Sequence, residues 1–176
     1  IDQNRSKLQK MLSIDRNLSI SIKIDQNQNA QEISEKLSAL AAEKILDNVD
    51  DILEDKAKFI DQDHSKATYA KKIDKEESRI DWDEDASKII GKINGLFPSP
   101  GASFSFNGER YKILKAEIGN GIGQVGEIIS NQLEVACNKN QSIKILEIQR
   151  QGKRPQKISE FMLGSQIKKG SKLSNV

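Results

Sequence analysis

The side chains of this 176-residue sequence that are best suited to chemistry are cations gathered in its second half. Residues 86–176 carry 14 Lys/Arg against 6 Asp/Glu, a net charge of +8. Residues 1–85 carry 14 against 20, a net charge of −6. A basic module attracts polyanions, and nucleic acid is the commonest polyanion of the cytosol. A lysine-rich surface that only keeps the protein in solution is the alternative interpretation.

The cations fall in a polar connector, an alternating segment and a loop around Gly152 and Pro155. Arginine presents planar donors suited to phosphate, and lysine presents a point charge. Phe104 and Phe106 are the only plausible stacking pair, and their alternation favours the core. We therefore expect contacts mainly with backbone phosphate, as for a folded RNA. The expected RNA-binding residues are Lys71, Lys72, Lys75, Arg79, Arg110, Lys112, Lys115, Arg150, Lys153, Arg154 and Lys157.

Enzyme and metal motifs are missing from this sequence. It has no Gly-x-Ser-x-Gly, no Walker loop and no metal-spaced His pair. One cysteine, Cys137, and one histidine, His64, exclude an internal disulfide and argue against a His/Cys metal site. No apolar run approaches the roughly 20 residues of a membrane helix. We expect a cytoplasmic protein that holds no metal and contacts no membrane, with no catalytic residue assigned.

Glycines recur over residues 119–126, in the pattern Gly121-x-Gly123-x-x-Gly126. A dinucleotide-binding loop of this spacing needs a strand before it and a helix after it. Here a strand is expected on both sides. Turn formation is therefore the better explanation of these glycines.

The first half predicts one long helix between a strand and a connector. Alternation over residues 18–24 indicates a strand, with apolar side chains on one face. Asn29 and Glu32 form a plausible capping box for a helix over 30–54, whose apolar stripe must pack on something. Residues 55–80 form the polar connector, in which His64 is expected on the surface.

The second half predicts a short helix and then several strands. Asp83 is expected to cap a helix over 84–97 that ends at Pro98 and Pro100. The pair Asn107-Gly108 between alternating runs indicates a β-hairpin. Further strands are expected at 124–130, 132–137 and 142–150, and a helix at 157–163. Short strands joined by tight turns suggest a small closed barrel.

Several segments resemble one protein family. Residues 67–82, Ala-Thr-Tyr-Ala-Lys-Lys-Ile-Asp-Lys-Glu-Glu-Ser-Arg-Ile-Asp-Trp, resemble the linker and domain entry of bacterial methionyl-tRNA formyltransferases. Residues 97–102 are similar to the family's Pro-x-Pro-Gly stretch. Residues 133–137 and 145–153 are similar to its later strands and basic loop, and residues 170–173 to its C-terminus.

The resemblance implies an α+β fold. A C-terminal OB-like β-barrel preceded by a helix would be joined by a linker to the terminal strand and helix of a truncated α/β domain. Residues 1–54 would be the remnant of the N-terminal formyltransferase domain, 55–80 the linker and 81–176 the OB-like tRNA-binding domain. The family transfers a formyl group from 10-formyltetrahydrofolate to the amino group of methionyl initiator tRNA. The partner would be initiator methionyl-tRNA, the chain a monomer, and no cofactor is expected to bind this chain.

The sequence also departs from the family pattern. The catalytic Asn-x-His-x-Ser-Leu-Leu-Pro segment has no counterpart, so we expect a C-terminal part that is inactive alone. A start at Ile1 fits this expectation. Two alternatives stay open: the C-terminal module of a formyltransferase acting on sugars or folate, and a non-enzymatic RNA-binding module. The charge of +8 over residues 86–176 favours tRNA.

Overall fold

The computed structural model describes residues 23–25, 27–59, 61 and 63–173. The chain divides into two units, with a boundary between Lys72 and Ile73, and residues 25–33 group with the second unit. Residues 18–22 of the expected first strand lie outside the described residues, and residues 23–25 have irregular backbone. None of the described helices is long and apolar enough to cross a bilayer.

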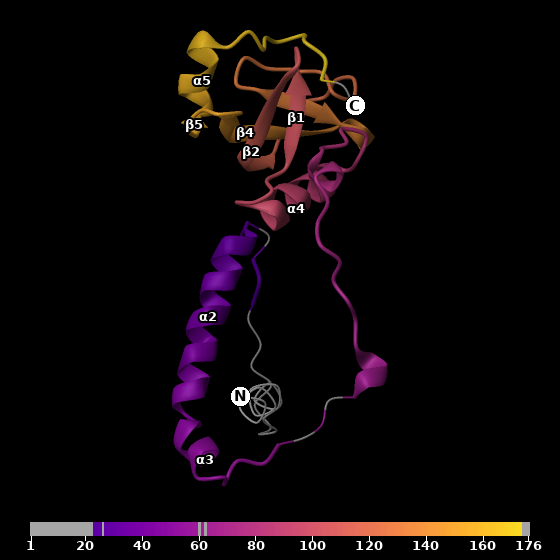
Figure 1. Cartoon of the computed structure of the whole chain (residues 1–176). Helices are drawn as coiled ribbons and strands as arrows, with labels where there is room; N and C mark the ends of the chain where they lie inside the picture. Colours follow the sequence, from indigo (N-terminus) through magenta and orange to yellow (C-terminus); the bar gives the residue numbers. More distant parts are fainter. Residues whose placement is uncertain (1–22, 26, 60, 62, 174–176) are drawn as a thin grey trace. The chain divides into compact units, whose positions relative to one another are not determined.

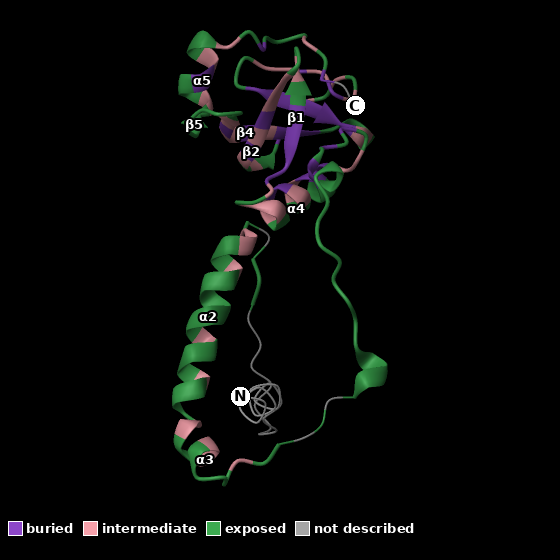
Figure 2. Cartoon of the chain, viewed as in Figure 1, coloured by how far each residue is buried: buried purple, intermediate pink, exposed green. Residues whose placement is uncertain are grey.

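The helix expected at 30–54 lies mostly in the first unit and is present in two pieces. These are α2 (Ala30–Leu46) and α3 (Val49–Leu53). The predicted capping box is confirmed: Asn29 Oδ1 accepts from the Glu32 amide at 3.0 Å, and Glu32 Oε2 accepts from the Asn29 amide at 3.3 Å. Between the pieces, Asn48 Nδ2 donates to the Lys44 carbonyl at 2.7 Å and competes with the continuing helix. No residue of α2 is buried, and Leu37 is 50% exposed (Figure 2).

The connector contains two single turns of 3-10 helix, at His64–Lys66 and Glu76–Ser78. Asp63 Oδ1 accepts from the Ser65 amide at 3.0 Å and starts the first turn. His64 is exposed, as the sequence predicts.

The second unit holds a five-stranded antiparallel sheet with the order β1-β2-β4-β3 (Figure 1). Its strands are β1 (Ser103–Phe106), β2 (Glu109–Ile118), β3 (Glu134–Cys137), β4 (Gln141–Arg150) and β5 (Gln156–Lys157). The predicted hairpin is confirmed: Asn107 and Gly108 have φ of 51° and 79°, which a two-residue turn between twisted strands requires. β2 covers one edge of β4, while β3 and β5 cover the two ends of the other edge.

The sheet does not close into the predicted barrel. β1 and β3 lie at the two ends of the strand order, and no described pairing joins them. The strand expected at 124–130 is absent: Glu127 and Ile128 form only isolated bridges, to Lys172 and Val135. The glycines before them explain this, because Gly126 has a φ of 79° and turns the chain away. The α+β class is correct, and the closed barrel is wrong.

Two helices pack on different parts of the sheet (Figure 1). Helix α4 (Ala86–Leu96) contacts β2 and β4, and α5 (Ile158–Gly164) contacts β4 and β5. The sequence placed both helices correctly but not the cap of α4. Asp83 does not cap it; Asp85 occupies the N-cap, and Gln141 Oε1 accepts from the Ala86 amide at 2.9 Å.

The core of this unit contains four aromatic rings in consecutive contact, surrounded by isoleucines. Trp82 meets Phe104 edge to face at 5.9 Å, Phe104 stacks on Tyr111 at 5.4 Å, and Tyr111 meets Phe161 edge to face at 5.8 Å. Trp82 is fully buried and Phe104 is 4% exposed. Phe104 is therefore a core residue, as its alternation predicts, and this packing fixes the start of β2 beside α5.

Candidate nucleic-acid interface

One hollow of the sheet unit is lined by cations of the predicted basic loop. It encloses about 580 Å³ between the β1–β2 turn, the loop after β4, and α5. We call it the α5 hollow. Its charged lining residues are Glu109, Arg150, Lys153, Arg154 and Glu160, three cations against two carboxylates.

Arg150 in this hollow is already engaged. Its guanidinium forms an ion pair with Glu109 Oε1, and the Tyr111 hydroxyl donates to Glu109 Oε2 at 2.9 Å. The hydrogen bond from Tyr111 and the Arg150 guanidinium hold the pKa of Glu109 below its ordinary value of 4.5. Burial, followed by the hydrogen bond to Glu109, raises the pKa of Tyr111 above 10. The network therefore keeps Glu109 ionised and offsets the charge of Arg150.

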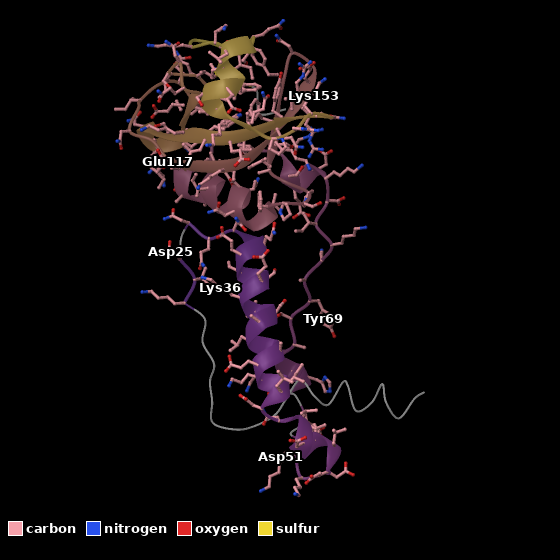
Figure 3. All side chains as sticks on the ribbon, turned by 90° about the vertical axis from the view of Figure 1, so that its left-hand side faces the viewer. Asp25, Lys36, Asp51, Tyr69, Glu117 and Lys153 are labelled. Carbon is pink, nitrogen blue, oxygen red and sulfur yellow. The ribbon has the colours of Figure 1, made fainter. Side chains whose placement is uncertain are left out.

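Lys153 and Arg154 are the cations of the α5 hollow that remain available. Both are exposed, and neither side chain forms a hydrogen bond or ion pair with any part of the chain that the structure describes. The turn that carries them is fixed by its backbone: the Lys153 amide donates to the Arg150 carbonyl at 3.0 Å, and Gln149 Nε2 donates to the Lys153 carbonyl at 2.9 Å. Lys153 lies at the other side of the sheet unit from Glu117 (Figure 3).

A second, smaller hollow gathers three more of the predicted cations. It encloses about 180 Å³ and is lined by Lys75, Arg79 and Arg110, with Glu76 as its carboxylate. We call it the Arg110 hollow. Arg79 Nε pairs with Glu76 at 3.2 Å in an exposed ion pair. Arg110 has no carboxylate partner among the described residues, and its two recorded bonds go to serine hydroxyls.

The two hollows lie on different faces of the β1–β2 hairpin. Arg150 is opposite Tyr111 in the register, so both side chains lie on the face that carries the core. Arg110 and Lys112 flank Tyr111 along β2 and point to the other face, as their spacing predicts. The predicted cations are therefore grouped but do not form one continuous surface.

The remaining predicted cations occupy other surroundings. The aliphatic part of the Lys112 side chain packs beside Gly101. Lys115 and Lys157 are both opposite Glu147 in the register, on either side of it. Lys71 and Lys72 are exposed residues in irregular backbone of the first unit.

The sequence did not predict which side chains bind these cations, and these partners decide whether the charge of each arginine is neutralised. Glu109 was visible as the residue after the Asn-Gly turn, but its pairing depends on the register between β2 and β4. Ser78 and Ser103, which hold Arg110, are 0% and 2% exposed and had no signal in the sequence. No three His, Cys, Asp or Glu side chains of the described ranges gather as a metal site would need.

The glycine-rich stretch surrounds a buried carboxylate. Glu134 Oε1 accepts from the Asn120 amide at 3.1 Å, the Gly121 amide at 2.8 Å and the Ser142 hydroxyl at 2.7 Å. A Cβ at Gly119 would collide with this carboxylate. The glycines let the backbone pass close to Glu134, and β3 rather than a helix is the next element, so the context that a dinucleotide-binding loop requires is missing from this described segment.

Comparison with known proteins identifies the module. A methionyl-tRNA formyltransferase of Pelagibacter ubique is 61% identical over 155 residues, which cover 88% of this chain and 50% of the relative. The corresponding enzyme of Rickettsia massiliae is 37% identical over 155 residues, 85% of this chain and 49% of the relative. The chain therefore spans about half the length of the curated relatives it matches.

Solved structures share the fold at low identity. A variant of HypX from Aquifex aeolicus superposes with a TM-score of 0.64 and 17% identity, covering 81% of this chain and 27% of that chain. WlaRD, described as a sugar 3N-formyl transferase, superposes with a TM-score of 0.53 and 20% identity, covering 76% and 48%. Residues 72–166, just over half of the chain, match the family described as "Formyl transferase, C-terminal domain". The chain belongs to the formyl transferase C-terminal domain family.

Proposed function

We propose that this chain is the C-terminal part of a methionyl-tRNA formyltransferase and that it helps to hold the tRNA. The complete enzyme would transfer a formyl group from 10-formyltetrahydrofolate to the amino group of methionyl initiator tRNA. The 61% identity to the Pelagibacter ubique enzyme supports the assignment to methionyl-tRNA formyltransferase. The basic hollows support the role in holding tRNA. No residue of this chain is assigned to the formyl donor or to the chemical step.

The binding role rests on one observation: the side chains of Lys153 and Arg154 are exposed and form no ion pair or hydrogen bond with the described residues. They project from a hydrogen-bonded turn, and neither forms an ion pair with a carboxylate among the residues the structure describes, while Glu160 lines the same hollow. Neutralising a phosphate releases condensed counterions, which favours binding by such uncompensated cations. Arg150 beside them is compensated by Glu109, so we assign it a lesser share of the affinity.

The wider assignment belongs to the same proposal. Residues 1–54 would belong to the formyltransferase domain, 55–80 to the linker and 81–176 to an OB-like tRNA-binding domain. The partner would be initiator methionyl-tRNA, bound by a cytoplasmic monomer. The match of residues 72–166 to the family supports a C-terminal domain and also includes the last residues of the proposed linker.

Salt dependence of tRNA binding tests this proposal. The 176-residue chain should bind initiator tRNA, and the logarithm of its affinity should fall linearly with the logarithm of salt concentration. The slope should be about 0.7–0.9 for each phosphate neutralised. Fluorescence anisotropy of end-labelled tRNA between 25 and about 200 mM KCl measures it. Absence of binding at the lowest salt, or affinity independent of salt, would refute the role.

A further inference from the structure

We propose that the Arg110 hollow is a binding site for a single backbone phosphate, with Arg110 as the residue that contacts it. The proposal rests on the proposed RNA-binding function and adds a site to it, on a different face of the β1–β2 hairpin from Lys153 and Arg154.

Arg110 is held in position by two neutral partners. Its Nε donates to Ser103 Oγ at 3.0 Å, and its Nη2 donates to Ser78 Oγ at 3.0 Å. Ser78 uses its own proton to donate to the Lys75 carbonyl at 2.6 Å, so its oxygen is left to accept from Arg110. Both serines are buried, so they hold the guanidinium against the lining of the hollow.

The guanidinium still has donors and charge to offer. It carries five N–H groups, of which two serve the serines, leaving three without a recorded partner in the described chain. Serine hydroxyls satisfy donors without cancelling the positive charge. Lys75, Arg79 and Arg110 against Glu76 give the lining a net charge of +2.

The size of the hollow selects a small anion. Its volume of about 180 Å³ lies below the roughly 300–1,000 Å³ of sites that enclose a drug-sized ligand. A phosphate group is compact and accepts paired N–H donors from arginine. Arg150 offers the contrast: it is also an arginine at a hollow, but its guanidinium already pairs with the Glu109 carboxylate.

The test uses the guanidinium resonances of Arg110 in the isotopically labelled 176-residue chain, with those of Arg150 as internal control. Dimethyl phosphate, a model of the RNA diester, should shift the Arg110 resonances in a saturable manner and leave those of Arg150 unchanged. No shift at Arg110, or equal shifts at both arginines, would overturn the proposal. A response to inorganic phosphate but not to dimethyl phosphate would also overturn it, because the site would then select free phosphate.

A second measurement connects the site to RNA. Arg110→Lys keeps the charge but loses the planar fork, so initiator tRNA affinity should fall about three- to ten-fold at low salt, while Arg150→Lys should change it less than two-fold. An amide spectrum like that of the unsubstituted chain checks folding. Equal effects of the two substitutions would contradict the site. If the unsubstituted chain fails to bind tRNA, the proposed function fails, and the dimethyl phosphate titration still decides on the Arg110 hollow.

Discussion

Glu109 at the start of β2 pairs with Arg150 at the end of β4 and joins the two strands beside the basic loop. The same carboxylate accepts from the Tyr111 hydroxyl, so one acidic residue both ties the strand ends and reduces the positive charge of the α5 hollow. The pair is partly exposed, with side chains 46% and 41% accessible, so water screens it and its effect on stability is small. The larger effect of the pair is that Glu109 offsets the positive charge of Arg150 at the α5 hollow.

Removing this carboxylate charge should strengthen RNA binding. Glu109→Gln leaves the Arg150 charge uncompensated, so we expect initiator tRNA affinity at low salt to rise by roughly two- to five-fold and the salt slope to steepen. Glu117→Gln is the matched control, because it removes the same charge from the far end of β2. Anisotropy titrations of the two variants check this. Equal gains in both would show that net charge, and not this position, governs affinity.

The buried Glu134 should make the sheet unit sensitive to acid. Burial by itself would raise the pKa of Glu134, but hydrogen bonds from Ser142 and Gly121 outweigh it and leave the pKa below 4.5. A carboxyl whose pKa is lower in the folded state than in the unfolded state stabilises the fold at pH values above its unfolded-state pKa. This stabilisation is lost as the pH falls through the folded-state pKa. The free energy of unfolding should therefore decline below about pH 4.5. Urea titrations of the unsubstituted chain and Glu134→Gln from pH 3 to 7 measure it; parallel pH profiles would contradict the role of Glu134.

Gly126 should tolerate no side chain. It has a φ of 79°, and an added Cβ would approach the Leu173 carbonyl oxygen more closely than real Cβ atoms do. The Leu173 amide donates to the Gly126 carbonyl at 2.8 Å, so the clash also disturbs this contact. We expect Gly126→Ala to destabilise the fold by about 2–4 kcal/mol.

Gly170→Ala is the control for Gly126→Ala. Gly170 has a φ of 84° but nothing within 4 Å of an added Cβ, so it should show the backbone strain alone, about 1 kcal/mol. Thermal unfolding of both variants separates strain from collision. Equal losses would mean that the collision with Leu173 relaxes without cost.

Cys137 should be unreactive in the folded chain. It is 1% exposed, and burial raises the pKa of its thiol to about 11. The thiolate is the reactive form, so both access and ionisation oppose modification. A colorimetric disulfide reagent at pH 8 should label Cys137 only after denaturant is added. Rapid labelling of the native chain would contradict its buried position.

Local signals in the sequence predicted much of this fold. The Asn29 capping box, the Asn107-Gly108 hairpin and the helix expected at 157–163, found at Ile158–Gly164, each depend on a few neighbouring residues, and each is confirmed. The barrel closure depends on pairing between distant strands, which alternation cannot specify, and it was wrong.

The candidate site also combines features that local sequence predicts with features that depend on distant residues. The spacing of Arg110 and Lys112 predicted a shared face correctly. The sequence did not separate Arg110, held by serines, from Arg150, neutralised by Glu109, because register and side-chain geometry decide these partners. Whether any of the eleven predicted cations contacts tRNA stays a prediction.

The affinity of the double variant Lys153→Gln/Arg154→Gln for initiator tRNA tests the proposed role most directly. Loss of two uncompensated cations should lower the salt slope by about 1.5 and weaken binding at low salt at least roughly ten-fold. The control Lys88→Gln/Lys169→Gln removes two exposed cations that form no ion pair with the described residues and line neither hollow, and should change the slope by less than about 0.5. An unchanged slope in the first variant, or equal losses in the two, would contradict the assignment of tRNA binding to the basic loop.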